Sequence, residues 1–380
     1  MKPLATRTQR IGGKGAFGVW ERAVALEAQG VKIIHLVLGE PDFPTPPHIV
    51  EAAHQAMQAG RTHYASSSGD MALREAIANY LAGSRVGTFN PTDILITPGV
   101  KGTLYFSLLA LVDHGDEVLV PSPFFPPYAS VIQFAGGTPV VCPLYESNGF
   151  QLDPADLAAR ITPQTKAIIL NSPGNPTGAI FSQETLAAVA DLAQTHDLWV
   201  LSDEVYHQLY YTETPPPSIY TLPGMSDRTI LMDGFSKAYA MTGWRLGFGV
   251  FPEILHTPIS TMMVSDHACI PLFIQDAGTA ALTSKQDCID TMRAAYRQRR
   301  DRALAVIETM PKVHCVVPDG AFYILLNITE TGYEAEAFAY RLLEAGVALL
   351  PVGTDHLRLA FTRPEAEIVE GLERMAAIIN

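Results

Sequence analysis

Short apolar runs alternate with helical segments through the middle of this 380-residue chain, and this alternation constrains its fold more than any other feature. The runs are rich in β-branched residues and include DEVLVPSP, TPVVCPL, KAIILNSP, LWVLSDE, RTILMDGFS and WRLGFGVF. Strands that are apolar throughout, with helices between them, are typical of a mostly parallel sheet that helices cover on both faces. We therefore predict an α/β fold built around such a sheet.

The pattern changes after about residue 285. A long charged helix is predicted at 288–310, and an apolar strand, a helix at 334–346, two short strands and a final helix follow it. We interpret this part as a smaller α+β domain, which the first 40 residues join because they lack a core of their own. The predicted division is an N-terminal arm with part of the small domain at 1–44, a large domain at 45–284 and the rest of the small domain at 285–380.

Composition excludes several classes of protein. The net charge is −13 and no basic block is present, so nucleic-acid binding has no electrostatic support. The longest uncharged run, residues 118–145, contains six prolines, which a membrane-spanning helix would not. The N-terminus has no apolar stretch of the secretory kind and the four cysteines form no C-x-x-C pair, so we expect a cytoplasmic protein with reduced thiols and no metal site.

Polar side chains follow three consecutive apolar runs. Asn175 lies in NSPGNPTG after KAIIL, Asp203 and Tyr206 lie in SDEVY after LWVL, and Lys237 ends DGFSK after RTILM. Ligands of open α/β sheets bind beyond the carboxyl ends of the strands, so these four side chains are predicted to meet at one edge. A lysine in so apolar a segment is costly to bury unless it is paired, neutral or used chemically.

These residue types suit pyridoxal phosphate as a cofactor. Its aldehyde forms an imine with a lysine amine, its ring nitrogen needs a buried carboxylate to stay protonated, and its phenolic oxygen accepts hydrogen bonds from Tyr or Asn. Its phosphate suits an arginine, a hydroxyl and the N–H groups of a helix start. Arg245 and Ser236 can supply the first two, and TPGVKGT at 97–103 opens a predicted helix that can supply the last.

The motifs LGEPDFPTP, NSPGNPTG, SDEVY and SKAYAMTGWRLGF resemble those of the class I/II aminotransferases, pyridoxal-phosphate enzymes of fold type I that include aspartate aminotransferase. The match runs in order from about residue 20 to the C-terminus. The resemblance implies a large cofactor-binding domain with a seven-stranded, mostly parallel sheet and a smaller α+β domain. It also implies transfer of an amino group between an α-amino acid and a 2-oxo acid.

The resemblance implies a role at the cofactor for each matching residue. Lys237 would bind the aldehyde and Asp203 would pair with the ring N–H, both as catalytic residues. The other cofactor contacts would be Asn175 and Tyr206 at the 3′-oxygen, Phe125 stacked on the ring, and Ser236, Arg245 and the backbone of Val100 and Lys101 at the phosphate.

The resemblance also implies residues that bind the substrate or serve a second subunit. Arg358 in HLRLAF would bind the substrate α-carboxylate, with Gly39 and Asn175 nearby. Tyr64 in THYASSSG would reach the phosphate of the neighbouring subunit, which implies a homodimer. Charged residues make up only 17% of the chain, which leaves apolar surface for a large subunit interface.

Several alternatives remain open. The segment GKGAFGVW (13–20) fits G-x-G-x-x-G, but no strand precedes it and no kinase motifs follow, so we interpret it as a flexible arm. The same site chemistry would serve a β-lyase, a decarboxylase or an amino-acid oxidase, and a non-catalytic ligand-sensing module is a further alternative. The substrate stays open, because Lys101 indicates an acidic side chain whereas Phe17, Phe124 and Phe125 indicate an apolar one.

Overall fold

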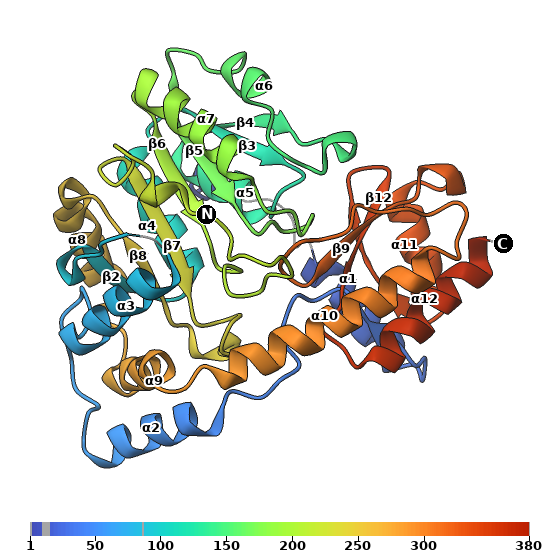
Figure 1. Cartoon of the computed structure of the whole chain (residues 1–380), viewed down its shortest axis with the longest axis horizontal. Helices are drawn as coiled ribbons and strands as arrows, with labels where there is room; N and C mark the ends of the chain where they lie inside the picture. Colours follow the sequence, from blue (N-terminus) through green and yellow to red (C-terminus); the bar gives the residue numbers. More distant parts are fainter. Residues whose placement is uncertain (1, 10–15, 86, 380) are drawn as a thin grey trace.

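The computed structural model describes residues 2–9, 16–85 and 87–379, which form a larger and a smaller body lying side by side (Figure 1). The larger body contains a sheet with the strand order β2-β8-β7-β6-β5-β3-β4. Its seven strands are β2 (Ile94–Thr97), β3 (Glu117–Ser122), β4 (Thr138–Pro143), β5 (Thr165–Asn171), β6 (Trp199–Asp203), β7 (Thr229–Gly234) and β8 (Gly247–Val250). β8 runs antiparallel to β2 and β7 and the other pairings are parallel, so the predicted seven-stranded, mostly parallel sheet is confirmed.

Helices cover both faces of this sheet. On β5, the successive residues Ile168 and Ile169 point to opposite faces and join different apolar clusters. The face that Ile169 joins is covered by α4 (Val100–Leu111), α5 (Pro127–Ala135) and α8 (His256–His267). The face that Ile168 joins is covered by α6 (Pro154–Ala158) and α7 (Gln183–Thr195) and, toward β2, by α3 (Met71–Ser84) and α9 (Leu272–Thr283), with α2 (Pro47–Gln58) packed on α9.

The smaller body holds the C-terminal part of the chain. Its three-stranded antiparallel sheet has the order β11-β12-β9, and α10 runs to it from the larger body (Figure 1). Its elements are α10 (Asp287–Ile307), β9 (Tyr323–Asn327), α11 (Ala335–Glu344), β10 (Val347–Ala348), β11 (Leu350–Val352), β12 (His356–Ala360) and α12 (Glu365–Ile379). The predicted smaller α+β part is confirmed.

The N-terminal part of the chain contacts the smaller body. β1 (Ile34–His35) pairs in parallel with β10, and α1 (Ala16–Glu27) packs there through Ala23. The predicted flexible arm at 13–20 lies partly outside the described residues, and its described part, 16–20, begins α1. The domain boundaries at residues 44 and 284 stay a prediction.

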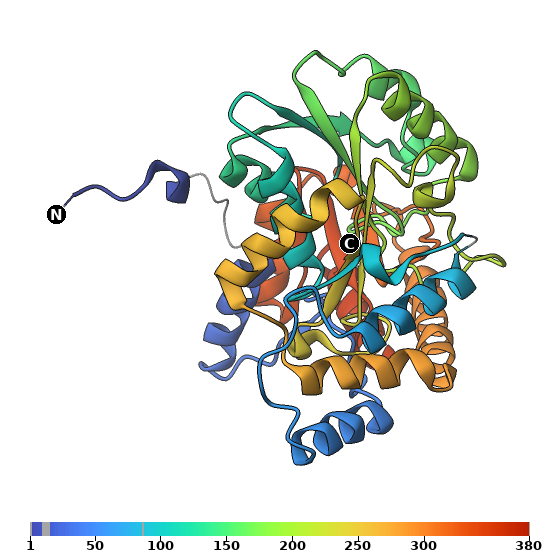
Figure 2. The ribbon, with the colours of Figure 1, turned by 90° about the vertical axis from the view of Figure 1, so that its left-hand side faces the viewer.

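The remaining elements are short. Residues 2–9 extend away from the smaller body, and their 3-10 helix η1 (Thr6–Gln9) contacts α5 of the larger body (Figure 2). Further 3-10 helices in the connections are η2 (Pro91–Asp93), η3 (Glu146–Asn148), η4 (Ile219–Thr221), η5 (Thr242–Trp244), η6 (Glu253–Leu255) and η7 (Thr329–Thr331). Among the described helices, none has both the length and the apolar character needed to cross a membrane.

Candidate active site

A cavity of about 580 Å³ lies at the carboxyl ends of β5 and β6 and beside β12 of the smaller body. It brings together eleven of the twelve predicted site residues: Gly39, Val100, Lys101, Phe125, Asn175, Asp203, Tyr206, Ser236, Lys237, Arg245 and Arg358. The twelfth, Tyr64, does not line the cavity and is 87% exposed. The cavity is also lined by residues that were not predicted: Leu38, Glu40, Leu104, Tyr128, Asn171, Val205, Thr242 and Tyr323.

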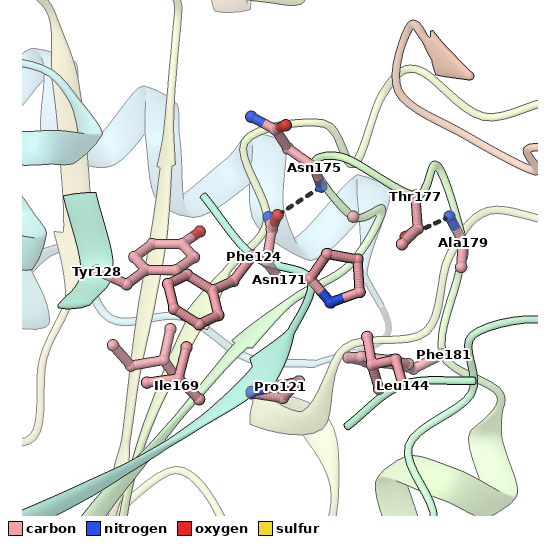
Figure 3. A pocket seen from close by; sticks show the side chains of 13 residues that line it. Pro121, Phe124, Tyr128, Leu144, Ile169, Asn171, Asn175, Thr177, Ala179 and Phe181 are labelled. Atoms are coloured by element: carbon pink, nitrogen blue, oxygen red, sulfur yellow. Dashed lines mark hydrogen bonds between the residues drawn. The ribbon is translucent and has the colours of Figure 1, made fainter. Parts of the chain in front are cut away.

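The loop after β5 fixes the position of Asn175. Asn171, the last residue of β5, accepts a hydrogen bond at Oδ1 from the backbone N–H of Asn175 over 2.8 Å, as Figure 3 shows. Its Nδ2 donates to the carbonyl oxygen of Asp203 over 3.0 Å, so the ends of β5 and β6 are tied together. The pocket in Figure 3, whose walls include Phe124 and Tyr128, measures about 20 Å³, which suits a water molecule rather than a substrate.

Lys237 follows β7, and its amine is held inside the cavity. Nζ donates a hydrogen bond to the carbonyl oxygen of Gly39 over 2.6 Å. Burial lowers the pKa of the amine to about 8; Glu40 opposes the shift, and the cation of Arg358 adds to it. A lysine with this pKa is partly neutral near pH 8, so it can act as a nucleophile or a base.

Asp203 ends β6 and is a buried carboxylate. Its Oδ2 accepts a hydrogen bond from the Tyr128 hydroxyl over 2.7 Å, and its Oδ1 accepts one from the backbone N–H of Val205 over 3.2 Å. Burial raises the pKa of this carboxyl to about 6, although the Tyr128 hydrogen bond opposes the shift. Within the described part of the chain no cationic side chain forms an ion pair with it, so the site suits a ligand that brings a positive charge.

An anion-binding end of the cavity is built where α4 begins. Gly99 precedes α4 with φ +77°, and a Cβ at this position would lie 2.5 Å from Nη2 of Arg245. Glycine therefore leaves room for the guanidinium beside the helix N-terminus. Arg245 donates from Nη1 to the carbonyl oxygen of Thr242 over 2.7 Å and, with Ser236, lines the cavity. A helix start with an arginine and a hydroxyl is the arrangement that binds phosphate groups.

Arg358 reaches the cavity from β12 of the smaller body. Its Nη1 donates to Oδ1 of Asn175 over 2.9 Å and its Nη2 donates to the carbonyl oxygen of Val37 over 2.7 Å. The side chain is buried, and its Nε has no hydrogen-bond partner. A buried guanidinium with a free donor and no acidic partner among the described residues suits a carboxylate ligand.

Two tyrosines close the side of the cavity beside Arg358. The hydroxyls of Tyr206 and Tyr323 lie 2.8 Å apart, and the Arg358 guanidinium lies 4.5 Å from the ring centroid of Tyr323. Burial raises the pKa of both phenols, so both are neutral and can donate hydrogen bonds. Tyr323 lies in the predicted strand AFYILLNI, where its aromatic type alone gave no functional signal.

Lys101 and Phe125 contact each other in the wall of the cavity. Nζ of Lys101 lies 5.3 Å from the centroid of the Phe125 ring, and that ring makes an edge contact with Tyr128. Burial lowers the pKa of Lys101, and the charge of Arg245 adds to the shift. This part of the cavity thus offers both a cation and an aromatic surface to a ligand.

A buried network of charges lies behind the strand ends. Arg85 donates from Nε to Glu204 over 2.6 Å and from Nη2 to Asp233 over 2.8 Å, and all three side chains are buried. Glu204 directly follows Asp203, and Asp233 lies in β7 four residues before Lys237. The network therefore joins the chain segments that carry Asp203 and Lys237. Glu204 and Asp233 lie in the segments SDEVY and DGFSK, but sequence reasoning assigned no role to either of them or to Arg85.

The cavity lies at the carboxyl ends of strands in a mostly parallel sheet, which is where α/β enzymes bind their ligands. Residues 31–375 match the family model "Aminotransferase class I and II". The chain belongs to this family, and it is an aminotransferase, as the sequence motifs predict.

Known relatives resemble the chain over its whole length. The aspartate/prephenate aminotransferase of Thermus thermophilus is 36% identical over 100% of both chains. The arginine–pyruvate transaminase of Pseudomonas aeruginosa is 38% identical over 97% of this chain and 96% of its own length. The structure of Thermus thermophilus aspartate aminotransferase with maleate superposes with a TM-score of 0.94, covering 100% of both chains at 36% identity.

Proposed function

We propose that the cavity binds pyridoxal 5′-phosphate and that the enzyme uses it to move an amino group between an α-amino acid and a 2-oxo acid. The observation that carries this proposal is the presence in one cavity of Asp203, a buried carboxylate without a cationic partner, and Lys237, an amine whose pKa burial lowers. When bound, pyridoxal phosphate supplies an aldehyde that accepts the amino group and a protonated ring that withdraws electrons from the substrate Cα.

The residues of the cavity suit each part of this cofactor. Lys237 would hold it covalently, and the Asp203 carboxylate would keep its ring nitrogen protonated. Asn175 and Tyr206 would donate to its 3′-oxygen. The other contacts would be Phe125 against the ring, and Ser236, Arg245 and the backbone N–H groups of Val100 and Lys101 at the phosphate.

The same residues would orient the substrate and move its proton. Arg358 would bind the α-carboxylate, since its guanidinium is already held by Asn175 and Val37 and keeps Nε free. The backbone of Gly39 also lines the cavity, where its carbonyl oxygen accepts a hydrogen bond from Nζ of Lys237. Nζ of Lys237, once it is released from its own bond, would remove the proton from Cα, because its lowered pKa leaves a neutral fraction.

The cavity also limits the substrate side chain. Nζ of Lys101 lies over the Phe125 ring, 5.3 Å from its centroid, so a side chain that reaches this part of the cavity would meet a cation next to an aromatic ring. This combination suits a donor with an acidic or an aromatic side chain. Such donors match the names of relatives that act on aspartate, prephenate or aromatic amino acids.

Exposed apolar residues support a homodimer. Tyr64 is 87% exposed, and Val50, Met57 and Met71 on α2 and α3 are 46%, 44% and 44% exposed. Exposed apolar side chains of this kind mark protein interfaces. We assign Tyr64 to the phosphate of the second subunit, and we assign the enzyme to the cytoplasm because its cysteines are free thiols.

The test of this function is a panel of amino donors with 2-oxoglutarate as acceptor, in which the new 2-oxo acid is measured. The proposal predicts amino-group transfer that depends on added pyridoxal phosphate after the protein has been stripped of it. A β-lyase or a decarboxylase would instead release ammonia or carbon dioxide without an acceptor. A ligand-sensing module would bind the cofactor without turnover.

A further inference from the structure

A polar contact between the two bodies joins Glu146 to the strand that carries Arg358. Glu146 begins η3, just after β4 of the larger body, while His314, Asn327 and His356 lie side by side on three adjacent segments of the smaller body. Nδ2 of Asn327 donates to Oε2 of Glu146 over 2.6 Å. His356 faces the other carboxylate oxygen, with Nε2 3.5 Å from Oε1.

Two buried atoms in this contact, Oε1 of Glu146 and Nε2 of His356, have no hydrogen-bond partner among the residues that the structure describes. The other ring nitrogen of His356, Nδ1, lies 2.8 Å from Oδ1 of Asp355. Because the ionised carboxylate of Asp355 can only accept a hydrogen bond, Nδ1 of His356 must carry a hydrogen. If the ring is neutral, Nε2 then has no hydrogen, and its lone pair faces a lone pair of Oε1 of Glu146. A second proton on the ring makes Nε2 a donor and satisfies both buried atoms.

Acidic side chains lie on both sides of the His356 ring. The ring lies between the carboxylates of Glu146 and Asp355, and its side chain is 16% exposed. The third ionisable neighbour, His314, approaches Oε2 of Glu146 at 3.7 Å but is 55% exposed. An imidazolium between two carboxylates is therefore the arrangement that leaves no buried group unpaired.

The position of His356 links this contact to substrate binding. His356 and Arg358 are two residues apart on β12, so their side chains leave the same face of the strand. His356 reaches Glu146 and Arg358 reaches Asn175. Glu146 and Asn175 both belong to the larger body. On the neighbouring strand, Leu325 pairs with Arg358 and packs on Phe150 and Ala179 of the larger body. The contact at Glu146 thus helps to set where β12 lies against the larger body.

We infer that protonated His356 and Glu146 form a positioning pair that holds β12, and with it Arg358, in the place where the substrate carboxylate binds. This inference rests on the role proposed above for Arg358. The pair needs the second proton on the ring, and an imidazole gives up that proton as pH rises.

The test measures KM for a 2-oxo acid acceptor, which has no titrating amine, from about pH 6 to about pH 9 with the cofactor-bound enzyme. Wild-type KM should rise about fivefold over this range, which is the low end of coupling between two sites. In the matched variant Glu146→Gln, the new amide N–H can donate to neutral Nε2 while its carbonyl accepts from Asn327. This variant should therefore keep a low KM toward pH 9, where wild-type KM rises, and the titration of Lys237, which both proteins share, cancels in the comparison.

Two further variants test whether the effect comes from His356 or from its exposed neighbour His314. His356→Leu removes the donor, so its KM should equal the high-pH wild-type value at every pH. His314→Gln changes the exposed neighbour and should follow wild type. An effect of His314→Gln as large as that of His356→Leu would overturn the assignment to His356.

A readout that does not depend on Arg358 is the temperature of unfolding at each pH. Because a protonated pair stabilises the folded state, wild type should lose stability relative to Glu146→Gln as pH rises. Wild-type KM and unfolding temperature that parallel those of Glu146→Gln at every pH would overturn the inference. If wild-type KM does not change with pH while the unfolding temperature changes as expected, the pair is a structural contact only. That result would contradict the inference that the pair positions Arg358.

Discussion

Arg358 donates a hydrogen bond from Nη1 to Oδ1 of Asn175 over 2.9 Å, and the two residues lie in different bodies of the protein. Nη2 of the same guanidinium is bound to the carbonyl oxygen of Val37, whereas Nε is buried and has no partner. The protein therefore holds the arginine in place, and its Nε–H has no partner among the described residues. A substrate carboxylate that reaches this donor would contact both bodies at once.

Arg358→Lys should raise KM for every amino donor and every 2-oxo acid acceptor, because all of them share the α-carboxylate. Lysine cannot reproduce the planar set of donors, and a loss of about 2 kcal/mol in kcat/KM is expected for a hydrogen bond to a charged group. Steady-state kinetics with several donors check this, with amines that lack a carboxylate as the control. Weakening confined to substrates with acidic side chains would contradict the assignment.

Asp203→Asn should increase the stability of the cofactor-free protein but decrease its turnover with the cofactor bound. The carboxyl pKa is raised from 3.8 to about 6 by burial, so the folded protein binds this proton more tightly than the unfolded chain does. The free energy of unfolding of the cofactor-free wild type therefore falls as pH rises from about 4 to about 6. The Asp203→Asn variant has no carboxyl group at this position, so its free energy of unfolding does not show this decrease.

Above about pH 6 the cofactor-free Asp203→Asn variant should be more stable than wild type by on the order of 2 kcal/mol, and the difference should vanish near pH 4. With pyridoxal phosphate bound, its turnover should fall about 100-fold or more, because the ring nitrogen loses its charged partner. Denaturant unfolding at several pH values and steady-state kinetics measure the two effects. Near-normal turnover would mean that another group serves the ring nitrogen.

Tyr64→Ala and Lys237→Ala should complement each other if active sites are shared between subunits. A mixed dimer contains one site with both wild-type residues, so random exchange of two inactive variants should restore about a quarter of wild-type activity. Size-exclusion chromatography of differently tagged subunits shows that exchange has taken place. Absence of recovery after proven exchange would place Tyr64 outside the neighbour's site.

The sequence predicted that side chains following strand ends would lie together, and the structure brings them into one cavity. Asn175, Asp203 and Lys237 each come at or after the end of an apolar run, and each run forms a parallel strand of the sheet. Because the carboxyl ends of parallel strands lie at the same edge, the three side chains lie close together there. Tyr323 and Arg85 could not be found this way. Tyr323 lies inside a buried strand, and Arg85 is paired with acids that are 119 and 148 residues away, so long-range packing alone gives them their places.

Two helices of the larger body also escaped prediction. α8 contains Thr, Ser, Met and Asp residues without a clear apolar stripe, and only Ile259 and Met263 of its residues are buried. α9 packs on α2 and α3 through small residues such as Ala277 and Gly278, which give little periodic signal. Tertiary contacts therefore fix these helices more than local pattern does.

Lys101→Met should separate two classes of amino donor. The substitution keeps the length of the side chain but removes the cation that faces the cavity 5.3 Å from the Phe125 ring. Donors with an acidic side chain should lose about tenfold in kcat/KM, whereas aromatic donors should change about twofold at most. The exposed Lys285→Met is the matched control and should leave both classes unchanged. An equal loss for both classes would assign Lys101 to the cofactor rather than to the side chain.

The most direct test of the account is reduction of the cofactor-bound enzyme with borohydride, followed by mass spectrometry of its peptides. The amine of Lys237 lies in the cavity beside Asp203 with a pKa lowered to about 8, so the cofactor should be fixed to the peptide that contains Lys237. Lys237→Ala should still bind pyridoxal phosphate but should show neither the covalent label nor turnover. Label on Lys101 or on any other lysine, or full turnover by Lys237→Ala, would contradict the account.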